Sequence, residues 1–449
     1  MQETCGLKDV TILLPCAGSS GIERVLKILW AKANKILPIH SGGDIRSYNI
    51  ARQLAKNHDL TFFSYYDGAP DRAYEKALQE HFPGAVCVCT GHRFDTPIRR
   101  GLDYISRLPR RAPYAVSRFA SNVIKAQLQS WYAEKAFDVA VCDFLDAAVN
   151  FPKDLTIPTV LFQHNVESEI WRRHATNGST RIMKVVYGVE FSKMRRYEED
   201  VVRSFHHVIA VSEHDKKLMC AWVDASQLSV VPTGVDTEIF HPDPPSIPEK
   251  PLVMFVGAMD WEPNVDAVEH FCREIWPVVL AAVPDAEFRI VGRNPGARVL
   301  RLASKSVEVT GRVSSVVDHL RKAAVVVVPL RIGGGTRLKI YEAMAVGTAL
   351  VSTTVGAEGL DVHNGQDIIL ADQSGEFAEA ILSLLRDPDA RRRYARAAAE
   401  LAVRHGWKAV GAKFEEVLEK VGALPPVCAK CDPVPLSRGK NPGSSEPAV

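Results

Sequence analysis

A cluster of prolines near the middle of the chain limits the possible folds more than any other feature. Five prolines fall within ten residues, at positions 242, 244, 245, 248 and 251. Proline lacks a backbone N–H and has a fixed φ, so this segment can form neither a helix nor an inner strand. We interpret 237–251 as a linker. It divides the 449 residues into two parts of ordinary domain size.

Short apolar runs alternate with helical periodicity on both sides of this linker. Residues 24–31 and 60–65 have the pattern of strands, and 44–57 between them has apolar residues at helical spacing, the start of a parallel sheet. We therefore expect an α/β protein with domains over 24–236 and 252–405, whose parallel sheets face each other across a ligand-binding cleft. Further strands are expected at 85–89, 139–142, 159–163, 207–211, 228–231, 252–256, 287–291, 323–328 and 349–353, and helices at 266–283, 375–385 and 390–421.

Composition and charge exclude several classes of protein. Hydrophobic residues make up 46% and charged residues 24%, which is typical of a soluble globular chain. The net charge of +2 gives no indication of a nucleic-acid partner. Apolar runs are shorter than the ~20 residues of a membrane span, and residues 1–23 lack the cationic start of a secretory signal. We expect a cytoplasmic protein with an N-terminal extension over 1–23 and a disordered tail over 424–449.

Metal ligands are not grouped in this sequence. Cys428 and Cys431 form one CxxC pair without a second pair or a nearby His. Zinc normally takes four ligands in proteins. We therefore expect no metal site.

The loop after the apolar run 323–328 combines glycine with positive charge. Glycines let the backbone approach a ligand closely, and the helix that follows points free N–H groups and its positive end at it. The pattern predicts a diphosphate site, although a tight turn with solvated basic side chains remains an alternative. The residues are Gly333, Gly334, Gly335, Thr336 as the N-cap, and Arg337 and Lys339 in the first turn.

Glu342 lies further along the same predicted helix. Its carboxylate is placed to accept hydrogen bonds from the two hydroxyls of a ribose. The spacings of a Walker A motif and of a GxGxxG fingerprint are missing, which argues against kinase, ATPase and dehydrogenase functions.

The glycine-rich loop and the residues that follow it, 333–342, resemble the C-terminal half of glycosyltransferase family 4. The resemblance continues through 343–347, the strand 350–353 and 356–359. The resemblance covers 24–420. It implies the GT-B architecture, in which two Rossmann-like domains face each other and the second holds most of the nucleotide sugar. It also implies a final helix, 406–423, that returns to the first domain. The chain is most similar to the sugar transferases that accompany exosortase and exopolysaccharide loci in bacteria.

Two segments of the N-terminal half also match the family. Gly42 and Gly43, followed by Arg46, resemble its first loop, where glycines approach the donor phosphates. His164, in the run 163–167 after a strand, resembles the family's histidine beside the donor sugar. The resemblance thus gives His164 a catalytic role in orienting the donor. A simple turn and a structural histidine are the alternatives.

The chain departs from the family pattern at three positions. The family commonly has a first glutamate eight residues before the second, and here that position is Gly334. Ala258 and Pro263 stand where the family has an Arg and a Lys after the first strand of the C-terminal domain. Charge for the diphosphate must then come from Arg337 and Lys339, and the identity of the donor does not carry over.

The resemblance implies a retaining glycosyltransferase, with hexosyl transfer from a nucleotide-diphosphate-sugar to a glycan or lipid-linked acceptor. Such an enzyme works without metal or other cofactor, here in cell-surface polysaccharide biosynthesis. Preorganised positive charge would stabilise the diphosphate leaving group. The alternatives are a degenerate GT-B protein that binds nucleotide sugar as a scaffold and a GT-B-type sugar-nucleotide epimerase.

The segment from Arg93 to Lys125 is rich in positive charge, with only Asp95 and Asp103 as acidic residues. It is interpreted either as a solvated surface or as a peripheral contact with anionic lipid on the inner face of the plasma membrane. The basic residues are Arg93, Arg99, Arg100, Arg107, Arg110, Arg111, Arg118 and Lys125, with Tyr104, Tyr114 and Phe119 among them.

Overall fold

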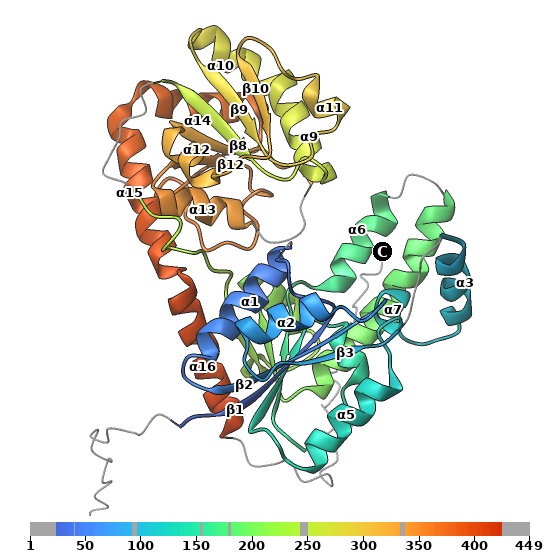
Figure 1. The fold of residues 1–449 in the computed structure, drawn as a ribbon. Helices are drawn as coiled ribbons and strands as arrows, with labels where there is room; N and C mark the ends of the chain where they lie inside the picture. The colour runs from blue at the N-terminus through green and yellow to red at the C-terminus, as the bar shows by residue number, and fades with distance from the viewer. Residues whose placement is uncertain are drawn as a thin grey trace, which may run out of the picture.

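Two parallel β-sheets organise the chain, one on each side of the linker (Figure 1). They belong to a computed structural model of the whole chain. The structure describes residues 24–39, 41–91, 97–152, 156–177, 181–242, 250–332 and 337–423.

The first sheet has seven parallel strands in the order β3-β2-β1-β4-β5-β6-β7. The strand order reverses between β1 and β4, and in open α/β sheets a ligand crevice lies at the carboxyl ends of such a pair. Runs of apolar and β-branched residues form these strands because both faces of the sheet are covered by helices. The strands are β1 (Lys27–Ala33), β2 (Asp59–Tyr66), β3 (Val86–Cys89), β4 (Val139–Asp143), β5 (Thr159–Phe162), β6 (His207–Ala210) and β7 (Leu228–Val230).

Helices cover both faces of this sheet and form two apolar cores. The first helix begins at a capping box, in which Ser41 and Asp44 satisfy each other's backbone N–H groups. The helices are α1 (Gly42–Leu54), α2 (Arg72–His81), α3 (Pro97–Arg107), α4 (Tyr114–Ser117), α5 (Asn122–Ala133), α6 (Glu167–Asn177), α7 (Arg181–Ser204) and α8 (Glu213–Met219), with the short turns η1 (Ala147–Asn150) and η2 (Ala225–Gln227).

The second sheet repeats the design with six parallel strands in the order β10-β9-β8-β11-β12-β13. Its order reverses between β8 and β11, so the carboxyl ends of these two strands mark its crevice. The strands are β8 (Leu252–Val256), β9 (Glu287–Val291), β10 (Val307–Gly311), β11 (Val325–Val328), β12 (Ala349–Ser352) and β13 (Ile369–Leu370). The sequence predicts neither β10 nor β13.

Two helices expected as continuous are interrupted, and the one predicted over 390–421 is divided at His405 and Gly406. The sequence predicts a helix over 266–283, but a π-helical turn, η3 (Phe271–Ile275), separates α9 (Glu262–His270) from α10 (Trp276–Ala282). Pro277 explains this break because it has no N–H to donate to the preceding turn. The other helices are α11 (Ala297–Leu300), α12 (Val316–Lys322), α13 (Leu338–Val346), α14 (Ser374–Arg386), α15 (Pro388–Arg404) and α16 (Trp407–Gly422).

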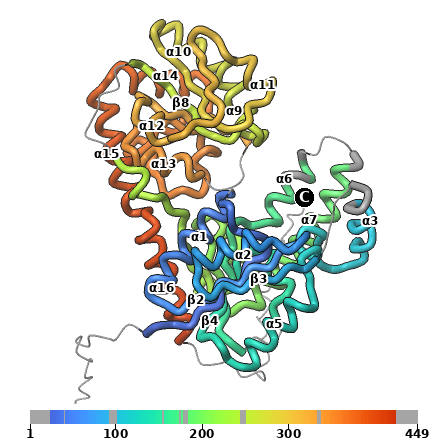
Figure 2. The backbone as a smooth tube through the Cα atoms, viewed as in Figure 1, coloured from blue at the N-terminus to red at the C-terminus, as the bar shows by residue number. Residues whose placement is uncertain are grey.

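The last helix, α16, returns to the first sheet although it follows the second along the chain (Figures 1 and 2). It packs on α1, and Phe414 contacts the ring of Trp30 at a centroid distance of 5.5 Å. Where it begins, Val235 and Gly406 form a β-bridge. The residues between α15 and α16 thus hold the two halves together at one side. None of the described helices is both long and apolar enough to cross a membrane.

Candidate active site

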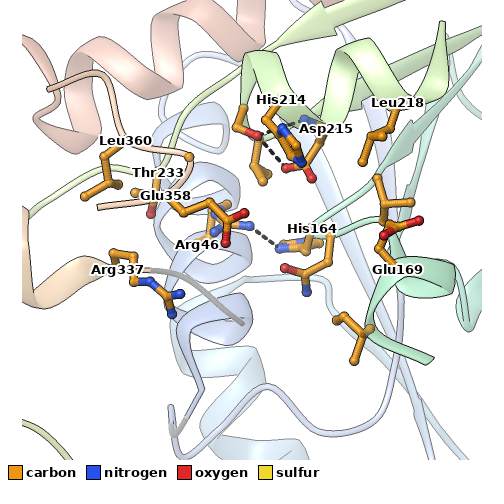
Figure 3. A pocket seen from close by; sticks show the side chains of 16 residues that line it. Arg46, His164, Glu169, His214, Asp215, Leu218, Thr233, Arg337, Glu358 and Leu360 are labelled. Carbon is orange, nitrogen blue, oxygen red and sulfur yellow. Dashed lines mark hydrogen bonds between the residues drawn. The ribbon is translucent and has the colours of Figure 1, made fainter. Parts of the chain in front are cut away.

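A cavity of about 100 Å³ lies between the two halves of the molecule (Figure 3). Its walls come from the first domain on one side and, on the other, from the loop after β12 and from Arg337, which stands at the N-cap of α13 where the sequence predicts Thr336. The residues that line it are Arg46, His164, Asn165, Val166, Glu169, Ile170, Val211, Ser212, His214, Asp215, Leu218, Thr233, Arg337, Glu358, Gly359 and Leu360.

Behind the first-domain wall, Asp143 collects hydrogen bonds at the end of β4. Trp30 donates to its Oδ2 at 3.0 Å and Ser47 to its Oδ1 at 2.9 Å. Lys32, on the neighbouring strand β1, places its Nζ 3.4 Å from Oδ2. Burial alone would raise the pKa of Asp143, but the charge of Lys32 and the hydrogen bonds outweigh it and hold that pKa well below its usual range. The carboxylate is therefore ionised and fully buried.

His164 connects Asp143 to the cavity. Its Nε2 donates to Oδ1 of Asp143 at 2.8 Å, and its Nδ1 accepts from Nη1 of Arg46 at 2.9 Å. These partners select the neutral tautomer with the proton on Nε2. Burial, opposed by Asp143 and helped by the nearby cations Arg46 and Lys32, lowers the pKa of His164 to about 3. With both ring nitrogens engaged, His164 holds Arg46 in place in the cavity wall (Figure 3).

Phe144 explains why glycine stands at position 43. Its φ of 73° is a left-handed conformation that side chains rarely adopt. In this conformation the ring stacks on His164 at a centroid distance of 3.8 Å. A Cβ on Gly43 would come within 2.5 Å of Phe144 Cζ. Gly42 and Gly43 form the first turn of α1, next to this packed ring.

Two carboxylates face Arg46 from other elements. Asp215, in the first turn of α8, accepts a hydrogen bond from Ser212 Oγ at 2.6 Å. Burial raises the pKa of Asp215, an effect that Ser212 and Arg46 oppose and Glu358 reinforces. Glu358 reaches the cavity from the second domain, and in Figure 3 its carboxylate points toward Arg46. The cavity is thus lined with charges of both signs from both domains.

Arg337 is the cation that the second domain contributes to the cavity. It is 3% exposed, and its Nη2 donates to the carbonyl of Val355 at 3.2 Å. Arg337 therefore lines the interdomain space instead of extending into bulk water. It also lowers the pKa of Lys339 two residues later.

Lys339 lies near the carboxyl end of β8, and Glu342 follows it by three residues on α13. Lys339 Nζ donates to Oδ1 of Asn264 at 2.8 Å and lies 4.4 Å from the ring centroid of Phe255. A Cβ on Gly257 would come within 2.9 Å of this Nζ, so glycine leaves room for the amine. Burial, helped by Arg337, lowers the pKa of Lys339 to about 7. Burial raises the pKa of Glu342 to about 7, although Lys339 opposes this shift.

Lys339 thus brings an amine to the end of the first strand of this domain, where the chain has Ala258 and Pro263 instead of the expected Arg and Lys. The described cavity lining includes His164 and Arg337, but not Lys339, Glu342, Gly42 or Gly43. Gly333, Gly334, Gly335 and Thr336 lie outside the described residues. The donor-binding roles of all these residues stay predictions.

Sequence reasoning missed the buried charges behind His164. Lys32 lies inside a strand that is otherwise almost entirely apolar, and Asp143 ends another such strand. A charged residue in this position is unusual enough to have served as a signal. Which partner each residue meets depends on the order of the strands, which the sequence does not state.

Within the ranges that the structure describes, no group of three or more His, Cys, Asp or Glu side chains could hold a metal ion. Cys428 and Cys431 lie outside those ranges.

Comparisons with known proteins agree on one family. The family model described as "Glycosyltransferase Family 4" matches residues 40–239, and that described as "Glycosyl transferases group 1" matches 250–387. A phosphatidyl-myo-inositol mannosyltransferase of Mycolicibacterium smegmatis is 24% identical over 306 residues, which cover 66% of this chain and 74% of that protein.

Solved structures share the fold at low sequence identity. HepE of Anabaena, crystallised with UDP, is 16% identical and has a TM-score of 0.63, covering 88% of this chain and 100% of that one. Sucrose-phosphate synthase of Thermosynechococcus elongatus is also 16% identical with a TM-score of 0.63, covering 88% and 99%. These likenesses, with the two parallel sheets, confirm the predicted two-domain α/β fold.

Proposed function

The chain belongs to the glycosyltransferases with a family 4 N-terminal domain and a group 1 C-terminal domain, in the GT-B arrangement, and from this premise we propose its reaction. It transfers a hexosyl group from a nucleoside-diphosphate-sugar to a glycan or lipid-linked acceptor and retains the anomeric configuration. The observation that carries the proposal is the position of Lys339, which Asn264 holds near the carboxyl end of β8, with Glu342 three residues later on α13 and Arg337 in the interdomain cavity.

The cations serve the leaving group. As the bond between the anomeric carbon and the diphosphate oxygen breaks, negative charge grows on the diphosphate. A fixed cation in a site that excludes water stabilises this charge strongly, by several kcal/mol (about 3–4 for one well-placed donor). Lys339 supplies a point charge held by Asn264, and Arg337 supplies a planar group with several donors.

Glu342 serves the ribose of the donor. An ionised carboxylate accepts hydrogen bonds from two adjacent hydroxyls, and a protonated one accepts them less well. In the empty site the pKa values of Glu342 and Lys339 both lie at about 7. A bound diphosphate favours the charged amine, and the charged amine in turn favours the carboxylate. Binding of the donor thus assembles the ion pair that the reaction uses.

The proton of the acceptor hydroxyl goes to the departing diphosphate oxygen, on the face where the acceptor attacks. No second carboxylate is then required, in contrast to glycoside hydrolases. His164 takes no proton in this scheme, because its two ring nitrogens are engaged by Asp143 and Arg46. Its role is to position Arg46 beside the donor sugar, and the enzyme works without a metal ion or other cofactor.

The relatives support the choice of donor and acceptor class. HepE of Anabaena was crystallised with UDP and with UDP-glucose. The relative from Mycolicibacterium smegmatis is named as a mannosyltransferase for phosphatidyl-myo-inositol, which is a lipid. We place the present enzyme in the cytoplasm at the inner face of the plasma membrane, acting in cell-surface polysaccharide synthesis such as exopolysaccharide production.

A panel of UDP-, GDP- and ADP-sugars tests the proposal. Each donor is incubated with the protein, and released nucleoside diphosphate is measured by chromatography. We expect at least one donor to be consumed, and Lys339→Met to suppress this activity whereas Lys305→Met, at an exposed lysine, leaves it unchanged. Tight donor binding without turnover would favour a scaffold. Failure of the folded protein to bind any donor would refute the proposal.

A further inference from the structure

Large apolar side chains are exposed on two helices of the first domain, away from the cavity. On α3, Leu102 and Ile105 are 63% and 62% exposed, and on α7, Val185 is 68% exposed. Soluble proteins rarely gather such side chains without a function for them. We call this surface the α3–α7 face. Its apolar members are Leu102, Ile105, Leu108, Met183, Val185 and Val189.

Hydrogen bonds hold the residues that follow α3 against α7. Lys193 on α7 donates to the carbonyl of Leu108, at the end of α3, at 2.6 Å. Glu190 on α7 accepts from the backbone N–H of Tyr114 at 2.8 Å. Figures 1 and 2 show α3 beside α7 at the outer side of the first domain. Ile105 follows Leu102 by three residues on α3, and Val189 follows Val185 by four on α7, so each of these two pairs lies along one side of its helix.

Within the described stretches 101–111 and 183–196 the exposed charged side chains are all positive, and further along α7 Asp200 is exposed. The two carboxylates in these stretches are not exposed to a partner. Asp103 forms an ion pair with Arg107, and Glu190 is buried. Arg107 is itself buried and donates to the carbonyl of Ser117. The exposed cations are Arg110, Arg111, Lys184, Arg195 and Arg196.

The basic segment expected from the sequence is therefore only part of this surface. Arg107 and Phe119 are buried, and Tyr104 packs edge-on against Tyr114. These residues stabilise the fold and are not available to a partner. Arg93 lies outside the described residues. The apolar members on α7, and the cations beside them, come from a segment more than fifty residues later in the chain.

We propose that the α3–α7 face docks on an anionic phospholipid bilayer. Aliphatic side chains would enter the boundary between headgroups and acyl chains, and the surrounding Arg and Lys side chains would lie among the phosphates. The chemistry favours a bilayer over a protein partner. Protein interfaces are enriched in aromatic residues and need matched polar groups, whereas the apolar members here are five branched aliphatic side chains and one methionine.

This docking would place the cavity next to the lipid surface. Helix α6 packs along α7, and its residues Glu169 and Ile170 line the cavity on the other side. One helix therefore separates the membrane contact from the site of transfer. The inference extends the proposed function and rests on it for its purpose, since it states how a lipid-linked acceptor would reach the cavity.

Flotation with vesicles tests the docking without any sugar donor. The full-length protein is mixed at low salt with vesicles of phosphatidylglycerol and phosphatidylethanolamine, or of phosphatidylcholine alone. We expect recovery with the anionic vesicles, loss of recovery in high salt, and little recovery with phosphatidylcholine.

The variants Ile105→Glu and Val185→Glu would each weaken binding to the vesicles at least about tenfold. Each removes an aliphatic group that docking would bury in the bilayer, and each adds a negative charge that the anionic lipid repels. Val403→Glu is the matched control, since Val403 is 67% exposed on α15. Equal binding by all three variants, equal binding to both lipids, or no flotation at low salt would overturn the proposal. Consumption of soluble donor, measured without vesicles, reports separately on the proposed function.

Discussion

The two walls of the interdomain site treat charge in opposite ways. On the first-domain wall, Asp143, His164 and Arg46 are each bonded to another side chain of the protein. The pKa values of Asp143 and His164 are driven far from neutrality, so their protonation does not change at physiological pH. On the second-domain side, on α13 behind the described cavity lining, Lys339 and Glu342 have pKa values of about 7. Their charges depend on what else is present.

This difference indicates that the first-domain side maintains a fixed geometry, whereas the second-domain side changes its charge when a ligand binds. A buried network whose hydrogen bonds are all made holds one geometry, and removing a member leaves a charge unpaired. A pair poised near neutrality can become fully charged when a ligand arrives. We therefore interpret the first-domain wall as the part that fixes the positions of Arg46 and Phe144, and the second as the part that binds the donor diphosphate and ribose.

The largest effect is expected from disrupting the hydrogen-bond network of the first-domain wall, and it should be a loss of stability. Asp143→Ala leaves Lys32 buried without its main counter-charge and His164 without its acceptor. We expect the free energy of unfolding, measured by urea denaturation, to fall by about 3–5 kcal/mol. Lys250→Ala removes an ion pair with Glu287 in which the lysine side chain is 70% exposed, and should change it by less than about 1 kcal/mol. Equal losses in the two variants would contradict the assignment.

In the second domain, Glu342→Ala should leave folding nearly intact but impair use of the sugar donor. Lost charge-assisted hydrogen bonds to two hydroxyls amount to about 2–4 kcal/mol. This corresponds to a decrease of about 30- to 1000-fold in kcat/KM for the donor. Glu416→Ala, at an exposed site on α16, is the control. Unchanged donor turnover by folded Glu342→Ala protein would refute the ribose role.

The pH dependence of donor affinity sharpens the contrast. Because the pKa of Lys339 is lowered to about 7, its amine is charged below that pH and neutral above it. Affinity for a nucleoside diphosphate, measured by calorimetry, should fall as the pH rises from 6.5 to 9. Lys339→Arg keeps a cation throughout this range and should flatten the profile, and Lys339→Met should bind about 10- to 150-fold more weakly at pH 6.5. A pH-independent wild-type affinity would contradict the role of Lys339.

The smallest effect is expected at His164, whose protonation should not change near neutral pH. With its pKa lowered to about 3, its ring resonances in NMR spectra should not move between pH 5 and 8. Arg46→Met removes a cation and a donor beside Nδ1, so it should raise that pKa. Kinetic assays of this variant should show reduced donor use with little change in pH optimum. A wild-type resonance that titrates near neutrality would mean that His164 exchanges protons.

Much of the fold was predictable because buried parallel strands are continuous apolar runs. Such runs identify β1, β4, β8 and β11 without knowledge of their partners. Strands at the edge of the sheet carry less signal: β10 includes exposed Glu308, and β13 has only two residues. The π-helical turn before Pro277 was missed because periodicity alone does not register one additional residue in a turn.

The candidate site was predictable only where its residues follow one another along the chain. Lys339 and Glu342 lie on α13, and Arg337 is the N-cap of this helix. Because the three residues are close together along the chain, the sequence itself indicates their association. The contact of Lys339 with Asn264, 75 residues earlier, depends on the order of the strands. The α3–α7 face combines segments from two distant parts of the chain. Which side of each helix remains exposed follows from tertiary packing and cannot be read from either helix alone.

The central claim is that the second-domain wall holds the diphosphate of a nucleotide sugar. A crystal structure with the nucleoside diphosphate selected by the donor panel tests it most directly. The account predicts a phosphate oxygen about 3 Å from Lys339 Nζ and ribose hydroxyls hydrogen-bonded to Glu342. A nucleotide bound away from both side chains, while the protein still consumes its donor, would contradict it.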